Sequence, residues 1–273
     1  MPLYVVATPI GNLGDLTERA REVLAACDGV VAEDTRHSGN LLKHLGIRKP
    51  LHALPAFDEA ARVEPLVRRL AAGESLALIT DAGTPAVSDP GAVLVRRAVE
   101  EGVRVVPVPG ASAAIAAVSV SGFPEGRFHF VGFLPRKASH RAEMLQELRS
   151  LRAQLVFYES PQRLSQTLAD LRSSLGDRPA LVARELTKLH EELARGTLSA
   201  LESHFAGEVR GEVAIVVRGA PEPAPEDPDA LESEVRARLS RGERPRDIAV
   251  ALSGAHSRRE VYQLALRLKK RTP

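Results

Sequence analysis

Hydrophobic residues in the first half of the chain gather in short, β-branched runs that are separated by segments with helical spacing. The runs are LYVVAT (3–8), GVVAED (29–34), SLALIT (75–80) and RVVPV (104–108). Between them, apolar residues recur three and four positions apart, as in Leu41, Leu42 and Leu45. This alternation is typical of βαβ units, so we predict an α/β fold with a mainly parallel sheet.

A second set of strand-like runs follows the segment SGFPEGR (121–127), whose glycines and proline predict a domain boundary. These runs are FHFVGF (128–133), QLVFYE (154–159), ALVARE (180–185) and GEVAIVV (211–217). The sequence therefore predicts an N-terminal α/β domain over residues 1–121 and a second α/β domain over residues 128–219.

The last part of the chain has a different pattern. APEPAPEDPDA (220–230) is rich in proline and acidic residues and predicts an extended linker. Beyond it, Val261, Leu264, Ala265 and Leu268 follow the spacing of one helix face. We predict a small helical module over residues 229–273, with two short helices joined as in a helix-turn-helix.

Composition limits the class of protein. The 273 residues are 44% hydrophobic and 26% charged, which is ordinary for a globular protein. A single cysteine, Cys27, excludes a disulfide framework and a thiolate cluster, and no spaced histidine pair indicates a metal. There is no apolar run long enough for a membrane span and no signal-peptide pattern at the start, so we expect a cytoplasmic protein.

Charge is distributed unevenly. The whole chain has a net charge of +2, but residues 229–273 contain eleven Lys and Arg against six Asp and Glu. A basic module of this kind favours phosphate contacts, so we expect it to hold RNA without taking part in the chemistry.

Four loops follow the predicted strands of the first sheet and are rich in Gly, Pro and small polar residues. They are TPIGNLGD (8–15), EDTRHSGN (33–40), TDAGTPAVSDPG (80–91) and PVPGASAA (107–114). Because ligands bind at the carboxyl ends of parallel strands, the four loops together predict a binding cleft.

The loops lack the usual phosphate-binding patterns. No G-x-G-x-x-G follows the first strand and no Walker lysine motif is present, so neither a dinucleotide nor an ATP phosphate site is indicated. Gly110–Ala114 imitates a G-x-S-x-G nucleophile elbow, but its fifth position is Ala and no motif supplies the partner His and acid. Ser112 is therefore expected to cap a helix or contact a ligand, with a serine hydrolase as the weaker alternative.

Eight segments in a fixed order resemble the bacterial 16S rRNA cytidine 2′-O-methyltransferase family, which has the tetrapyrrole-methylase fold. They are TPIGNLGDLT (8–17), AEDTRHSGNLLKHLGI (32–47), DAGTPAVSDPG (81–91), VPVPGASAAIAA (106–117), GFLPRK (132–137), VFYESPQRL (156–164), ARELTKLHEE (183–192) and GEVAIVV (211–217). The resemblance implies two α/β domains with S-adenosylmethionine (SAM) bound in the cleft between them, no metal, and a homodimer.

The resemblance also implies which residues contact SAM. In the first domain these are Ile10, Asp81, Ala82, Gly83, Val87, Ser112 and Ala113. In the second domain they are Tyr158, Glu159, Ala183, Glu212 and Val213. One segment departs from the family: LPAFDEA (54–60) lacks the usual His and Asn, so any RNA contact made there is altered.

Methyl transfer to a ribose hydroxyl benefits from a base or from a cation that stabilises the developing alkoxide. Asp34, Arg36, Glu185 and Lys188 follow strand ends and are the candidates for these roles. The structural alternative is that Asp34 caps a helix and that Glu185 and Lys188 form a surface pair.

Two other functions remain open at this point. A sister enzyme of the same fold would methylate a small tetrapyrrole precursor, and a non-catalytic protein would use the basic module to bind RNA. The basic module argues against the first alternative, and the complete set of cofactor loops argues against the second. The sequence therefore favours a SAM-dependent methyltransferase that acts on 16S rRNA, within the small ribosomal subunit.

Overall fold

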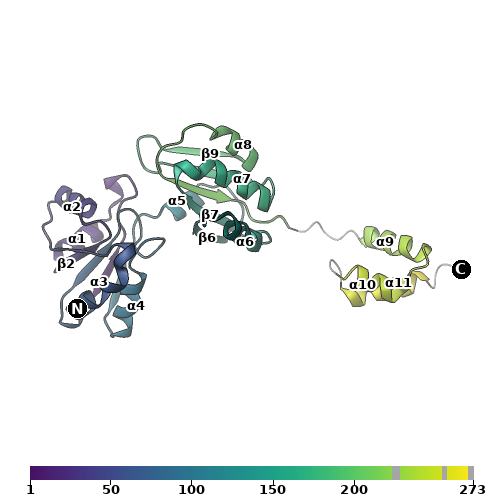
Figure 1. Ribbon diagram of the computed structural model, residues 1–273, viewed down its shortest axis with the longest axis horizontal. Helices are drawn as coiled ribbons and strands as arrows, with labels where there is room; N and C mark the ends of the chain where they lie inside the picture. The colour runs from purple at the N-terminus through teal and green to yellow at the C-terminus, as the bar shows by residue number, and fades with distance from the viewer. Residues whose placement is uncertain (223–227, 254–256, 270–273) are drawn as a thin grey trace. The chain divides into compact units, whose positions relative to one another are not determined.

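The computed structural model describes residues 1–222, 228–253 and 257–269 (Figure 1). The chain forms two compact units, Met1–Ala220 and Pro221–Pro273. Residues 223–227 of the linker predicted over 220–230 lie outside the described residues, and its last three residues belong to α9 (Pro228–Ser240).

The first unit begins with a sheet of five parallel strands in the order β3-β2-β4-β1-β5. Its strands are β1 (Leu3–Val6), β2 (Gly29–Ala32), β3 (Leu51–Ala53), β4 (Leu76–Ile79) and β5 (Val105–Val108). The helices between them are α1 (Glu18–Ala26), α2 (Thr35–His44), α3 (Glu59–Ala71) and α4 (Ala92–Glu100). The predicted parallel sheet is therefore confirmed.

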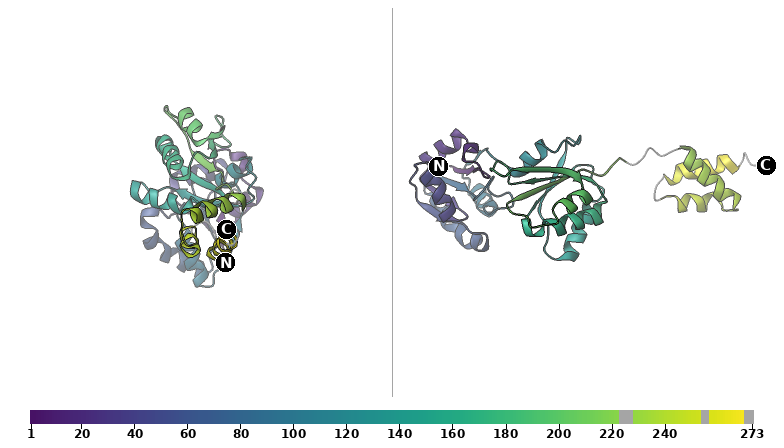
Figure 2. Two further views of the ribbon diagram at one scale, coloured as in Figure 1. Left: turned by 90° about the vertical axis from the view of Figure 1, so that its right-hand side faces the viewer. Right: turned by 90° about the horizontal axis from the view of Figure 1, so that it is seen from above.

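A second five-stranded sheet, in the order β6-β7-β10-β8-β9, completes the unit. Its strands are β6 (Phe128–Phe133), β7 (Gln154–Glu159), β8 (Pro179–Arg184), β9 (Glu192–Thr197) and β10 (Val213–Val217). Only β6 and β7 pair in parallel, and the other pairs are antiparallel. Its helices are α5 (Ala113–Ser119), α6 (Ala138–Leu148), α7 (Leu164–Leu175) and α8 (Leu198–His204), which Figure 2 shows from two further directions.

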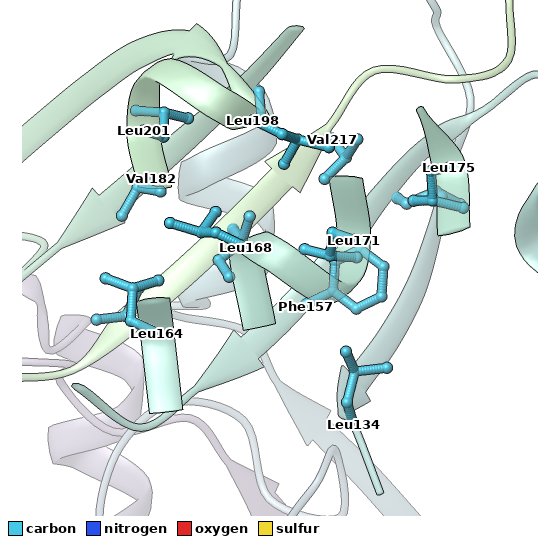
Figure 3. Close-up of a cluster of buried hydrophobic side chains, with 14 of the residues drawn as sticks. Leu134, Phe157, Leu164, Leu168, Leu171, Leu175, Val182, Leu198, Leu201 and Val217 are labelled. Atoms are coloured by element: carbon cyan, nitrogen blue, oxygen red, sulfur yellow. The ribbon is translucent and has the colours of Figure 1, made fainter. Parts of the chain in front are cut away.

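The two faces of the second sheet pack against different partners. On one face, Phe157 of β7 and Val217 of β10 contact the leucines of α7, Leu164, Leu168 and Leu171, as Figure 3 shows. On the other face, Val156, Ala183 and Ala214 pack against Ala114 and Ala117 of α5. Because α5 follows directly after β5 of the first sheet, this packing joins the two sheets.

The predicted boundary at 121–127 falls between α5 and β6. Both sheets nevertheless belong to one compact unit, so the division into domains over 1–121 and 128–219 stays a prediction. Two strands, β3 and β9, were not predicted, and both lie at sheet edges with only partly buried residues in most positions.

The second unit consists, in its described residues, of α9 (Pro228–Ser240), α10 (Pro245–Ala251) and α11 (Arg258–Lys269). Val261, Ala265 and Leu268 of α11 are buried against Val235 and Ile248. The predicted apolar helix face is therefore confirmed, with Leu264 at its edge. Within the described ranges, no helix is both long and apolar enough to cross a membrane.

Candidate cofactor site

Two loops at the carboxyl edge of the first sheet are tied together by their backbones. Thr8, after β1, and Gly83, after β4, exchange both main-chain hydrogen bonds, at 2.9 and 3.1 Å. The buried Thr8 hydroxyl also donates to the Thr80 carbonyl at 2.9 Å. These bonds fix the start of the 80–91 loop against the loop that carries Ile10.

The rest of the 80–91 loop has an unusual backbone. Ala86 and Ser88 have φ angles of 65° and 66°, in the left-handed region that costs a side-chain-bearing residue free energy. The loop end is held by Glu59, whose carboxylate accepts from the amides of Gly91 (2.9 Å) and Val93 (3.2 Å). Glu59 belongs to the divergent 54–60 segment, so this segment supports the loop from behind.

A cavity of about 410 Å³ lies against the 80–91 loop and the carboxyl-end loops of both sheets. This volume is typical of a small-molecule site. All twelve residues predicted to contact SAM line it: Ile10, Asp81, Ala82, Gly83, Val87, Ser112, Ala113, Tyr158, Glu159, Ala183, Glu212 and Val213.

Sequence reasoning missed nine residues of the cavity wall: Thr80, Thr84, Ser88, Asp89, Phe133, Ser160, Pro161, Leu186 and Ala214. Several of these lie in segments already identified. Thr80, Thr84, Ser88 and Asp89 belong to the 80–91 loop, and a prediction for the whole loop would have included them.

Three carboxylates at or near the cavity, those of Glu33, Asp81 and Asp89, have no ion pair with another described residue. Burial, with the charge of Asp81 as a further cause, raises the pKa of the Asp89 carboxyl. Burial and the charge of Asp89 raise the pKa of Glu33, which accepts a hydrogen bond from Thr80 at 3.2 Å. Asp81 has a buried Oδ1 without a hydrogen-bond partner among the described residues. The wall is therefore prepared for a ligand with positive charge.

Two polar side chains of the wall position helix α5. Ser112 is its N-cap and accepts from the Ile115 amide at 3.5 Å, as predicted for a capping hydroxyl. The Tyr158 hydroxyl accepts from the Ala114 amide at 3.1 Å. A second-sheet side chain thus holds the helix that borders the first-sheet side of the cavity.

Asp34 and Arg36 do not line the cavity. Asp34 is the N-cap of α2, with its Oδ1 accepting from the Arg36 amide at 2.8 Å. The Arg36 guanidinium, whose side chain is 89% exposed, pairs with Oδ2 at 2.7 Å. Hydrogen bonds from Arg36 hold the pKa of Asp34 well below its usual range. This arrangement agrees with the structural alternative for Asp34, and its catalytic role stays a prediction.

Glu185 and Lys188 are also outside the cavity wall, but directly behind it. Lys188 Nζ lies 2.8 Å from Glu185 Oε1 and 2.9 Å from Glu212 Oε2. Burial opposes the charge of this ammonium, but the hydrogen bonds to Glu185 and Glu212 raise its pKa. Lys188 therefore stays protonated and suits a stabilising cation rather than a base.

The Lys188 stem also packs on Gly11, where a Cβ would overlap it. The residues next to this contact, Ile10, Leu186 and Glu212, all line the cavity. The Lys188 ammonium lies next to Glu212, which lines the cavity, but does not line it itself. The catalytic roles of Glu185 and Lys188 thus stay predictions. Among the described residues, no group of three or more His, Cys, Asp or Glu side chains could hold a metal ion.

Comparisons with known proteins agree with this fold and site. Residues 2–202 match the family described as Tetrapyrrole (Corrin/Porphyrin) Methylases. The solved structure of the methyltransferase CobJ has a TM-score of 0.62 at 18% identity, covering 82% of this chain and 96% of that one. A diphthine synthase structure has a TM-score of 0.60 at 16% identity, covering 80% and 90%. The fold and the cavity thus define a SAM-dependent methyltransferase of the tetrapyrrole-methylase class.

Similar curated proteins identify the family within this class. The ribosomal RNA small subunit methyltransferase I of Xylella fastidiosa (strain Temecula1) is 50% identical over 222 residues, or 80% of this chain and 81% of the relative. The protein of the same name from Synechocystis sp. is 43% identical over 98% of both chains. The chain belongs to the ribosomal RNA small subunit methyltransferase I family, and the predicted resemblance is confirmed.

Proposed function

We propose that this methyltransferase transfers the methyl group of SAM to the 2′-hydroxyl of a cytidine ribose in the decoding region of 16S rRNA. The observation that carries the proposal is the Synechocystis relative, which is similar over 98% of both chains and is named as a small-subunit rRNA methyltransferase. That similarity includes the basic C-terminal unit and not only the methylase fold.

The cavity residues fit SAM chemically. SAM combines a sulfonium, an ammonium, a carboxylate and a neutral adenosine, so it needs carboxylates and apolar walls rather than a phosphate cradle. Asp81 and Asp89 supply carboxylates, and Ile10, Ala183 and Val213 supply apolar contacts. The twelve residues named above are accordingly the proposed SAM contacts, with Asp89 added to them.

SAM, when bound, supplies a methyl carbon that the sulfonium already activates. The protein has to align the ribose oxygen with that carbon, and such alignment is worth about 7–11 kcal/mol. Lys188, which stays protonated, is proposed to stabilise the developing alkoxide, and Glu185 positions it. Asp34 and Arg36 are proposed to orient the acceptor from the other sheet.

The charge of the C-terminal unit supports an RNA acceptor over a small tetrapyrrole. Five of its exposed arginines, Arg241, Arg244, Arg246, Arg258 and Arg259, have no ion pair with another described residue. Arg258 and Arg259 lie in the first turn of α11, where positive charge opposes the helix dipole. Phosphates would compensate both the missing partners and the dipole. Lys270 and Arg271, which are also basic, lie outside the described residues.

The proposal extends to the setting of the enzyme. We expect a cytoplasmic homodimer that acts on the small ribosomal subunit. Analytical ultracentrifugation at micromolar concentration should give twice the mass of the 273-residue chain, and a single monomeric species would contradict the dimer.

Mass spectrometry of 16S rRNA tests the acceptor. RNA from a strain that lacks the gene should lose one ribose methyl group on a cytidine of the decoding region, and the wild-type gene should restore it. A complete set of 16S methyl groups in the deletion strain would disprove the proposal. The appearance of an unmethylated tetrapyrrole precursor instead would support the small-molecule alternative.

The role of the basic unit is tested by removing residues 229–273. Residues 1–220 form a compact unit of their own, so the shortened chain should keep its SAM affinity. Its RNA affinity should fall and depend less steeply on salt, because fewer phosphate contacts release fewer counterions. An unchanged affinity with an unchanged salt slope would mean that the first unit alone holds the RNA.

A further inference from the structure

Strand β6 contains a one-residue irregularity just before it reaches the cavity. Phe128 and Phe130 pair with Gln154 and Val156 of β7, but the next pairs are Gly132 with Phe157 and Phe133 with Tyr158. Val131 is therefore an extra residue, a β-bulge. Without it, strict alternation would place Phe133 on the opposite sheet face from Phe130. The bulge places Phe133 on the same face as Tyr158.

Gly132 makes this bulge possible. Its φ of +74° lies in the region that favours glycine, and it is buried. A Cβ there would lie 2.9 Å from the Ser88 hydroxyl oxygen, so β6 approaches the 80–91 loop closely at this residue. Ser88 itself has a left-handed φ of 66°. A left-handed glycine and a strained serine thus meet beside Phe133.

The ring of Phe133 is supported but not covered. It packs edge-to-face on Tyr158, with 5.8 Å between ring centroids and an interplanar angle of 63°. Phe130 packs on the same tyrosine at 5.0 Å and 71°. The Tyr158 hydroxyl accepts a hydrogen bond from the Ala114 amide, so the ring on which Phe133 packs is itself held in position. Phe133 nevertheless remains 54% exposed while lining the cavity.

An exposed aromatic ring costs free energy in water, and a bulge that aims it into a cavity points to a planar ligand. We propose that Phe133 is a stacking platform for the acceptor nucleobase, and that it positions the target pyrimidine so that its ribose faces the methyl donor. This inference rests on the proposed rRNA acceptor. The adenine of SAM is the other planar ring that could reach the cavity, so the experiment separates the two.

Steady-state methylation of unmethylated small ribosomal subunits is the first measurement, with wild type, Phe133→Leu and Phe133→Tyr. Loss of base stacking on an aromatic ring typically weakens binding by about 5- to 100-fold. Phe133→Leu should raise KM for subunits by this factor and leave KM for SAM within about twofold. Phe133→Tyr keeps the aromatic face and should restore the wild-type KM for subunits.

Phe128 supplies the matched control. It lies on the same strand and is 43% exposed, but it does not line the cavity. Phe128→Leu should leave both KM values unchanged. If Phe133→Leu behaves like Phe128→Leu, or if Phe133→Tyr fails to restore KM, the stacking role is disproved. Wild-type enzyme that fails to methylate the subunits would instead disprove the proposed function itself.

Fluorescence distinguishes the two planar ligands. The chain has no tryptophan, so Phe133→Trp introduces a single reporter at the platform. S-adenosylhomocysteine alone should leave its emission unchanged, because the proposal assigns the platform to the acceptor base and not to the adenosine. Strong quenching by S-adenosylhomocysteine alone would assign Phe133 to the cofactor and overturn the proposal. Phe128→Trp, titrated in the same way, reports any quenching that does not come from the cavity.

Discussion

The loops 80–91 and 185–191 both contain strained backbone, but the carboxylates of the two loops have opposite pKa shifts. Ala86 and Ser88 have left-handed φ angles in the first loop, as do Glu185 and Thr187 in the second. In the first loop, the Asp89 carboxyl is half-buried and its pKa is raised. In the second, the hydrogen bond from Lys188 lowers the pKa of Glu185.

The contrast separates two uses of strain. The 80–91 loop leaves polar atoms unsatisfied, including the buried Oδ1 of Asp81, and it lines the cavity along much of its length. The 185–191 loop pairs Lys188 with Glu185 and with Glu212 of another segment, although the buried Thr187 hydroxyl has no partner among the described residues. This loop contributes only Leu186 to the wall. In the 80–91 loop, strained backbone accompanies carboxylates without a counter-charge, which favours a cationic ligand. In the 185–191 loop, strained backbone accompanies paired charges that hold the Lys188 ammonium in place.

Replacing Lys188 should give the largest effect and should act on turnover alone. Lys188→Ala removes the ammonium next to the cavity, and loss of one such stabilising group lowers kcat by about 100- to 1,000-fold. Calorimetry should show SAM affinity within about twofold of wild type, because the residue does not line the wall. Arg210→Ala removes an ion pair that is exposed on both sides and serves as the control. Equal turnover in the two variants would return Lys188 to a purely structural role.

Replacing Gly83 should have the complementary effect, on binding. Gly83 has a φ of +84° and shares two main-chain hydrogen bonds with Thr8, so Gly83→Val strains or breaks this bridge. A side chain in this conformation costs about 1–2 kcal/mol and would intrude on the ligand, so SAM affinity should fall about tenfold or more.

Gly73→Val is the matched control for Gly83→Val. Gly73 has a φ of +95°, a Cβ added there would meet no atom within 4 Å, and the residue lies outside the cavity wall. Both variants should therefore lose stability, and only Gly83→Val should lose SAM affinity. Calorimetry that gives the same affinity for both would remove the 80–91 loop from the SAM site.

The segment 33–36 combines both types of charge, because Glu33 has a raised pKa and Asp34 is paired. Asp34→Ala should lower methylation severalfold with SAM binding nearly intact, if orientation of the acceptor depends on the Arg36 pair. Thr17→Ala removes the N-cap of α1, a matched capping loss away from the cavity. The two variants should lose thermal stability alike, and activity equal in both would leave Asp34 as a helix cap only.

The smallest expected effect is on stability and its pH dependence. Unfolded Asp titrates near pH 3.9, and the Asp89 pKa is higher in the folded protein. Between these pKa values the folded state holds a proton that the unfolded state has released, so stability falls as pH rises through this window. Asp89→Asn removes that loss, and its melting temperature without SAM should exceed that of wild type at neutral pH while its SAM affinity falls.

Asp28 has a pKa shift of the opposite sign to that of Asp89 and completes this test. Hydrogen bonds from the Ser75 hydroxyl and amide lower its pKa. Its contribution to stability is therefore complete above about pH 4 and is lost as pH falls through the folded pKa. Asp28→Asn should lower the melting temperature at neutral pH. A lower melting temperature in both variants would contradict the view of Asp89 as an uncompensated carboxylate.

The central strands were predictable because burial on both faces leaves a continuous apolar run, as in Val30–Ala32 and Leu76–Ile79. β9 was missed because an edge strand with the sequence ELARGT alternates weakly and carries charge. β3 is only three residues long and partly buried, which leaves too little pattern to detect.

The cavity wall was predictable where it follows a strand end in sequence, since the resemblance applies there residue by residue. Phe133 was not, because a bulge that shifts the alternation of β6 depends on pairing with β7. The ion pairs of Lys188 could not be predicted either, because its partner Glu212 lies on a distant segment. Pairing between β10 and β8 places that segment next to the 185–191 loop.

The strand order of the first sheet also bears on synthesis of the chain. Leu3 of β1 pairs with Leu76 on one side and with Val105 on the other, so β1 leaves the ribosome before either of its neighbours. Non-local parallel pairing of this kind is slow, and an unpaired hydrophobic strand favours aggregation. A nascent chain stalled before Val105 thus leaves one edge of β1 unpaired, even when β4 has paired with the other edge.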